Sequence, residues 1–129
     1  MYKICIAVLV LMISSCTGNV PTSPTQEWEG LSFRVETRPP VPRIGMVEFL
    51  VVANREGRKP AWDLLVKLRL GETGQWKQAI EDGNMGVYRT ALPVRDPQKD
   101  ILNLYIRNSK QQETVLKIPL NYAQSVLEE

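Results

Sequence analysis

From Trp28 onward, apolar and polar side chains alternate with a period of two residues, and this alternation restricts the possible folds more than any other feature. The clearest example is the segment 64–70, whose alternate apolar positions are Leu64, Val66, Leu68 and Leu70. Successive side chains of a β-strand point to opposite faces of its sheet, so the pattern predicts strands that bury one face. Turn-forming residues separate these segments at roughly the 8–12-residue spacing of all-β domains, and no segment has the period of a helix of ordinary length.

The alternation predicts about seven strands. They fall within residues 31–36, 45–54, 64–70, 75–81, 87–94, 102–107 and 114–118. In the second of them, the parity opposite to Glu48 assigns to one face Val47, Phe49, Val51 and Ala53. The prolines Pro39, Pro40 and Pro42 cannot lie in a central strand and indicate an extended crossover or a broken edge. We therefore expect an all-β, immunoglobulin-like (Ig-like) antiparallel β-sandwich, with a small barrel as the alternative.

The first residues of the chain have the layout of a secretory signal peptide. Lys3 precedes the apolar run Ile4–Ile13, which is shorter than the about 20 residues of a spanning helix. The segment that follows the run ends in Ser14-Ser15-Cys16, and Ile13–Cys16 resembles the lipobox of bacterial lipoproteins. The resemblance implies cleavage between Ser15 and Cys16 and attachment of diacylglycerol to Cys16. An ordinary signal peptide with a chance cysteine and an uncleaved anchor are the two alternatives.

The cysteine content favours lipidation. Cys5 lies within the signal peptide and is removed with it, so Cys16 is the one cysteine of the mature chain and has no disulfide partner. A thioether to lipid removes a thiol that would be a liability in an oxidising compartment. Thr17, rather than Asp, follows Cys16. Under the sorting rule of enterobacteria-like lipoproteins this implies the outer membrane, facing the periplasm, whereas a Gram-positive source would use the outer face of its single membrane.

The remaining sequence divides into three parts after a signal peptide of residues 1–15. Residues 16–27 are polar and rich in Thr, Ser and Pro, which predicts a short, disordered, lipidated tether. Residues 28–120 are the predicted β-sandwich. Residues 121–129 form a C-terminal tail, for which we expect a short helical turn or a frayed end.

Three motifs of the sandwich resemble the YtkA-like and FixH-like group of small exported Ig-like domains. They are the apolar strand from Gly45 to Asn54, the turn Gly57–Ala61, and Gly86–Arg89 after a Gly/Asn/Asp turn, within a resemblance that covers residues 42–120. The resemblance implies an Ig-like fold. Some proteins of this group are associated with periplasmic copper handling or oxidase assembly, so it also implies a copper-handling or oxidase-assembly accessory protein as the alternative function.

The residue types argue against copper binding and catalysis. A copper site needs imidazole or sulfur ligands, but the chain has no His, and besides Cys16 its mature part offers only Met46 and Met85. We interpret Met46 as a strand-packing residue and Met85 as a turn residue. The usual nucleophile–base pairs need His or a free Cys, and Asp82 with Asn84 provides too few ligands for calcium and suits a tight turn. We predict no catalytic residue, no metal site and no cofactor.

The charge balance and the tryptophans define the expected partners. Removal of Lys3 leaves the mature chain nearly neutral, which argues against nucleic acid. Trp28, Trp62 and Trp76 lie near strand starts; they are candidate partner-binding residues, with core and edge packing as the alternative. We predict a membrane-tethered, non-catalytic protein-interaction or accessory module of the cell envelope, whose partner is another envelope protein. A purely structural subunit would have the same sequence features.

Overall fold

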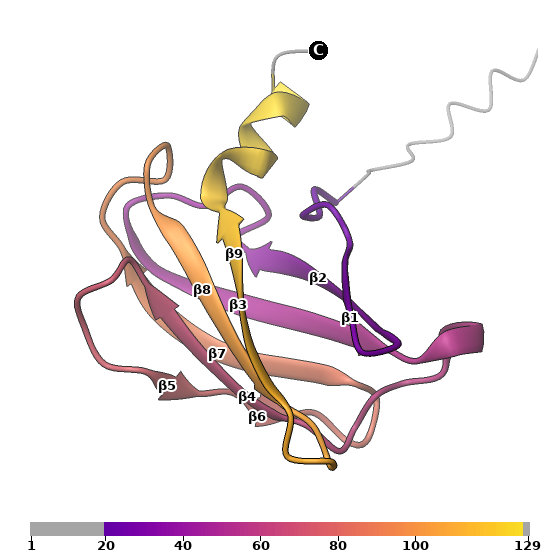
Figure 1. Ribbon diagram of the computed structural model, residues 1–129. Helices are drawn as coiled ribbons and strands as arrows, with labels where there is room; N and C mark the ends of the chain where they lie inside the picture. The colour runs from indigo at the N-terminus through magenta and orange to yellow at the C-terminus, as the bar shows by residue number, and fades with distance from the viewer. Residues whose placement is uncertain (1–19, 128–129) are drawn as a thin grey trace, which may run out of the picture.

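The computed structural model describes residues 20–127 and the side chains up to Ala123, and it consists of two antiparallel sheets packed face to face (Figure 1). The predicted signal peptide and the lipidation site at Cys16 lie outside the described residues. Among the described residues, no helix has the length and apolar character needed to cross a membrane. The expectation of an all-β sandwich is confirmed.

The larger sheet has five strands in the order β1-β2-β3-β7-β6. Their bounds are Gln26–Trp28 for β1, Leu31–Arg38 for β2, Gly45–Asn54 for β3, Val87–Val94 for β7 and Ile80–Glu81 for β6. The smaller sheet has four strands in the order β5-β4-β8-β9. Their bounds are Lys77–Gln78 for β5, Leu65–Leu70 for β4, Ile101–Arg107 for β8 and Glu113–Pro119 for β9. Two 3₁₀ helices, η1 and η2, cover Glu56–Arg58 and Leu120–Leu127.

The strand order is that of an Ig domain. Apart from the short edge strands β1 and β5, the order within the sheets, β2-β3-β7-β6 and β4-β8-β9, corresponds to the A-B-E-D and C-F-G sheets of a constant-type domain. The strands form two sheets with separate edges, rather than one closed barrel. The predicted connection through Pro39, Pro40 and Pro42 is not a crossover, because it joins β2 and β3, which pair directly in the same sheet.

The structure has more strands than the predicted number for two reasons. The predicted strand 75–81 divides at Ala79, because its first half pairs with β4 and its second half with β7. The chain thus passes from one sheet to the other while remaining extended. In addition, β1 pairs with β2 over Gln26–Trp28, a segment whose polar composition gives no strand pattern.

The core lies between the sheets and is formed by the inward positions of the alternating strands. Val47, Phe49, Val51 and Ala53 are fully buried, as their parity predicts. They pack with buried side chains of the other strands, among them Phe33, Val66, Leu68, Tyr88, Leu102, Leu104 and Ile106. The prediction for Met46 is wrong: its side chain is 60% exposed. Met46 has the parity of Glu48, so it lies on the outer face of β3 rather than in the core.

The packed domain begins before Trp28 and ends after Leu120. Ser23 is buried, its N–H donates to the Val35 carbonyl (2.9 Å), and its hydroxyl accepts the Val35 N–H (2.8 Å). The second half of the predicted tether is therefore bound along β2, where it satisfies edge groups of the sheet. At the other terminus, Ala123 is buried in η2 and Tyr122 packs against the core.

Candidate functional site

The three candidate tryptophans occupy different parts of the molecule. Trp28 lies opposite Leu31, whose side chain points into the core, and it packs against the core itself. Trp28 is therefore a packing residue. Trp62 lies in the connection between β3 and β4 and is 54% exposed. Trp76 directly precedes β5, beside the outer face of the smaller sheet. A common platform of all three is therefore not formed, and Trp62 and Trp76 belong to two separate surfaces.

Trp62 belongs to the end of the sandwich at which three connections meet. We call this the loop end and define it as residues 55–64 between β3 and β4, residues 82–86 between β6 and β7, and residues 108–112 between β8 and β9. A hollow lined by Glu29, Asp63 and Lys110 brings the first and third connections together beside the β1–β2 turn. The loop end lies opposite the end at which residue 20 enters the domain and η2 leaves it (Figure 1).

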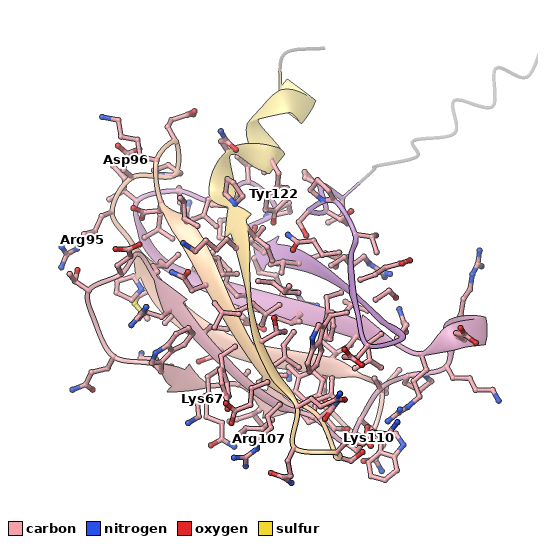
Figure 2. The ribbon with its side chains drawn as sticks, viewed as in Figure 1. Lys67, Arg95, Asp96, Arg107, Lys110 and Tyr122 are labelled. Atoms are coloured by element: carbon pink, nitrogen blue, oxygen red, sulfur yellow. The ribbon has the colours of Figure 1, made fainter. Side chains whose placement is uncertain are left out.

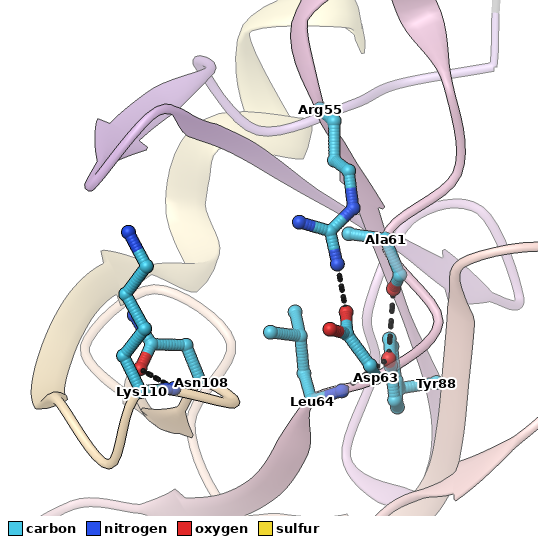
Figure 3. A network of polar contacts seen from close by, with 7 residues as sticks. All are labelled: Arg55, Ala61, Asp63, Leu64, Tyr88, Asn108 and Lys110. Carbon is cyan, nitrogen blue, oxygen red and sulfur yellow. Dashed lines mark hydrogen bonds and ion pairs between the residues drawn. The ribbon is translucent and has the colours of Figure 1, made fainter.

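Tyr88 holds the first connection, residues 55–64, in place from the side of the core. Its hydroxyl donates to the Ala61 carbonyl (2.8 Å) and accepts the Leu64 N–H (3.2 Å), so it bridges both sides of Trp62 (Figure 3). The side chain is fully buried, and this burial raises the pKa of the phenol to about 12. Tyr88 thus stays neutral and retains both hydrogen bonds throughout the physiological pH range.

Gly86 fixes the second connection against the first. Its carbonyl accepts the Ala53 N–H (2.8 Å), and Ala53 in turn accepts the Ala61 N–H (3.0 Å). The backbone of Gly86 has φ +73°, and a Cβ atom there would lie 2.5 Å from the Ala53 carbonyl oxygen. Only glycine allows this approach.

Polar contacts stabilise the other parts of the loop end. Arg55 forms an ion pair with Asp63 across the first connection (Figure 3). In the third connection, the Asn108 carboxamide oxygen accepts the N–H groups of Lys110 (3.0 Å) and Gln112 (2.9 Å). Such side-chain acceptors hold a turn in one conformation. The loop end is therefore preorganised.

Two large apolar side chains remain exposed on this preorganised end. Trp62 follows Ala61, and Met85, which is 68% exposed, precedes Gly86. Because Ala61 and Gly86 are in close contact, the backbone segments that carry the two exposed residues meet at one point of the loop end. The interpretation of Met85 as a turn residue is confirmed, and the turn presents it to solvent.

Trp76 belongs to the second surface, on the outer side of the smaller sheet. We call this the cationic face and define it as Lys67 and Arg69 of β4, Arg107 of β8, Lys117 of β9, and the aromatic residues Trp76 and Tyr105. Because the alternate residues of β4 and β8 are buried, these side chains point away from the core. Figure 2 shows Lys67 and Arg107 projecting from the same part of the molecule.

Aromatic rings hold two of the cations of this face. The Arg69 guanidinium carbon lies 4.4 Å from the centroid of the Trp76 ring. The Lys67 ammonium lies 5.7 Å from the centroid of Tyr105, its cross-strand partner. The two rings contact each other edge to face, with centroids 6.1 Å apart and an interplanar angle of 62°. Cation–π contacts of this kind restrict the mobility of long cationic side chains.

The cations of this face differ from those of the opposite face in their pairing. On the larger sheet, Arg34 pairs with Glu36 (3.8 Å) and Arg89 with both Glu48 (3.7 Å) and Asp82 (3.4 Å). Within residues 20–127, no ion pair involves Lys67, Arg69 or Arg107. The fourth cation of the face, Lys117, lies 4.0 Å from Glu72. Three of the four cations of the cationic face therefore have no ion pair among the described residues.

Tyr105 connects the cationic face to the acidic residue beside it. Desolvation, together with its hydrogen bond to Glu113, raises the pKa of the Tyr105 phenol, while Arg107 acts in the opposite direction. The phenol therefore remains a neutral donor and keeps Glu113 beside it. Glu113 pairs across the sheet with Arg107, so the acidic position lies at the border of the face.

Sequence reasoning missed most of the cationic face. Lys67 and Arg69 occupy outward positions of one predicted strand, and Tyr105 and Arg107 occupy outward positions of another. Their shared outward parity in the sequence could have indicated that these side chains lie on the exposed face of a sheet. What the sequence does not contain is the pairing of β4 with β8, which places the two sets side by side.

The possible metal ligands are separated in the structure. In the part of the chain described here, no three His, Cys, Asp or Glu side chains form a group that could hold a metal ion. Met46 pairs with Pro93 at one end of β3, whereas Met85 precedes Val87, which pairs with Val52 near the other end. The two thioethers therefore do not form a common site.

Comparison with known protein families found no matching family model, and comparisons with curated proteins and with solved structures found no significant match. The resemblance to the YtkA-like and FixH-like domains stays a prediction. The loop end and the cationic face are the two surfaces from which function is inferred.

Proposed function

We propose that this protein is a non-catalytic interaction module of the cell envelope, anchored by lipid on Cys16 and binding a partner protein through its loop end. The observation that carries the proposal is Trp62, an exposed aromatic side chain on a connection that Tyr88 fixes on both sides. In a Gram-negative source, Thr17 after the anchor favours the outer membrane, facing the periplasm.

The position of the loop end suits a tethered protein. The chain towards Cys16 enters the domain at Val20, at the end opposite to the loops (Figure 1). Because Pro21 is already buried, the segment from Cys16 to the domain is short and spans at most about 18 Å. A domain held this closely would turn its loop end away from the membrane, towards other envelope proteins.

Trp62 has the properties of an interface anchor. Tryptophan is enriched among the residues that dominate binding energy, because it buries a large area at a small cost in conformational entropy. The connection that carries Trp62 is already ordered by Tyr88 and by the Arg55–Asp63 ion pair, so partner binding requires little further ordering. Met85 adds a flexible apolar contact beside it.

Changing Trp62 to alanine should abolish recovery of the partner while leaving the fold intact. Loss of a central anchor typically costs 2 kcal/mol or more, which corresponds to about 30-fold in affinity. The measurement is affinity purification from cross-linked envelopes with quantitative mass spectrometry. The matched control is Ile44→Ala, which removes another exposed apolar side chain (75%) outside the loop end. Equal recovery of the same protein with both variants would contradict the loop-end assignment.

Changing Cys16 to serine should move the protein from the membrane fraction to the soluble fraction. Serine cannot accept the diacylglycerol thioether, and without the acyl chains the near-neutral domain has no means of stable attachment. Fractionation and incorporation of labelled palmitate measure the effect, and circular dichroism confirms that the fold is unchanged. A mutant that stays in the membrane would show that the apolar run Ile4–Ile13 persists as an uncleaved anchor.

A further inference from the structure

We propose that the cationic face is a second binding surface, which takes an extended acidic segment of a protein partner. The inference deepens the proposed interaction function and rests on it for the presence of a protein partner. It is carried by the cations on β4 and β8, by the rings that hold two of them, and by the lack of ion pairs around Lys67, Arg69 and Arg107 among the residues that the structure describes.

The spacing of the cations matches that of an extended polypeptide. Arg69 and Lys67 are alternate residues of β4, and Arg107 lies opposite Leu65, the next outward position of the same strand. Alternate residues of a strand are separated by roughly 6.6–6.8 Å along its axis. An extended segment with Asp or Glu at every second position has the same repeat, so its carboxylates would face successive cations.

The aromatic rings fix the positions of the cations that would bind carboxylates, and their own faces are covered rather than open to a ligand. The guanidinium of Arg69 covers Trp76, and Tyr105 packs against the same indole, so the indole is not left open for stacking on a sugar. The Arg69 Nε is buried and has no hydrogen-bond partner among the described residues. A guanidinium held in this way presents its remaining N–H groups in a fixed fork, which binds a carboxylate through two hydrogen bonds.

The mixed character of the border favours a polypeptide over a uniformly anionic surface. On β9, Glu113 and Val115, which is 46% exposed, lie next to the cations of β4 and β8. A bilayer of anionic lipids would meet the repulsion of Glu113, whereas a polypeptide can place an uncharged or basic residue opposite it. The segment that leads towards Cys16 also runs along β2 of the other sheet, so the anchor does not direct the cationic face to the membrane.

The test uses the full mature lipoprotein in detergent micelles and a labelled nine-residue peptide of alternating Glu and Thr. Fluorescence anisotropy at low and high salt measures the dissociation constant. We expect Arg69→Gln and Lys67→Gln each to weaken binding at least tenfold. The matched control is Arg43→Gln, which removes an exposed cation from the β2–β3 connection and should change the constant less than twofold. Two independent variants keep the result interpretable if one of them folds poorly.

Other outcomes would overturn the proposal. Equal weakening by Arg43→Gln would indicate non-specific attraction, and tighter binding of anionic phospholipid vesicles or polygalacturonate would assign the face to a membrane or a glycan. Self-association that Arg69→Gln removes would assign the face to a second copy of the chain. Trp62→Ala separates the two proposals, because it should leave the acidic-peptide constant unchanged. If Trp62→Ala does not affect partner recovery but Arg69→Gln still weakens the peptide, the loop-end proposal alone fails.

Discussion

Replacing Gly86 with alanine should lower the free energy of unfolding by about 3–4 kcal/mol, a large part of the stability of a domain of this size. The added Cβ would lie 2.5 Å from the Ala53 carbonyl oxygen and 3.0 Å from the Ala61 nitrogen. Both contacts are with backbone, so neither can be relieved by a side-chain rotation. Relief requires movement of the connection, which also breaks the hydrogen bond between Ala53 and Gly86.

Gly83→Ala is the matched control for this prediction. Gly83 belongs to the same turn and also has a positive φ (+57°), but nothing lies within 4 Å of the position of its Cβ. It should therefore lose only the conformational preference of glycine, about 1–2 kcal/mol. Urea unfolding followed by circular dichroism measures both variants. Equal losses of stability would mean that the positive φ, and not the close approach, makes glycine necessary at position 86.

Replacing Tyr88 with phenylalanine should lower the free energy of unfolding at neutral pH by about 2–3 kcal/mol. The variant keeps the ring, so it leaves no large cavity. It removes the hydroxyl that donates a hydrogen bond to the Ala61 carbonyl and accepts one from the Leu64 N–H. A polar group left without a partner in a buried position costs about 1–3 kcal/mol. A hydrogen-exchange measurement should show faster exchange of the Leu64 amide. Unchanged stability would indicate that water replaces the hydroxyl.

The same residue gives the protein a defined sensitivity to alkali. In the unfolded chain Tyr88 titrates near pH 10, and burial raises its folded pKa to about 12. Between these values the unfolded state releases the phenolic proton more readily, so stability is fully present below pH 10 and is lost as the pH rises to 12, by about 2–3 kcal/mol. Tyr122, whose pKa burial also raises to about 12, acts in the same direction. The stability of Tyr88→Phe should therefore retain only part of the wild-type dependence on pH. An unchanged dependence would show that groups other than Tyr88 cause the loss of stability at high pH.

Strand positions were predictable wherever a single face is buried. The strand Gly45–Asn54 has the predicted bounds and the predicted buried face, because its alternation is regular and turn residues flank it. The segment 75–81 was predicted as one strand, since alternation continues through Ala79 and carries no information on which sheet each half joins. The pairing of Ser23 with Val35 was missed because backbone groups and a hydroxyl form it, and a polar composition does not reveal such contacts.

The candidate surfaces were predictable only in part. Composition pointed to the tryptophans, and burial then separated Trp28, a packing residue, from Trp62, an exposed one. The cationic face depends on the register between strands that are far apart in the sequence, as in the pairing of Lys67 with Tyr105. The close approach at Gly86 depends on two connections meeting in space. Neither property is encoded in a local pattern.

The attachment of residues 23–28 along β2 has a mechanical consequence. A protein fixed to a membrane at one end and to a partner at the other is under tension whenever the two move apart. With the chain entering at one end of the sandwich and the loops at the other, this tension runs along the strands (Figure 1). The contacts of Ser23 with Val35 and the β1–β2 pairs would then be loaded in shear, all at once rather than in succession. Under the proposed lipid anchorage, this arrangement would let the domain resist extraction without unzipping its first strand.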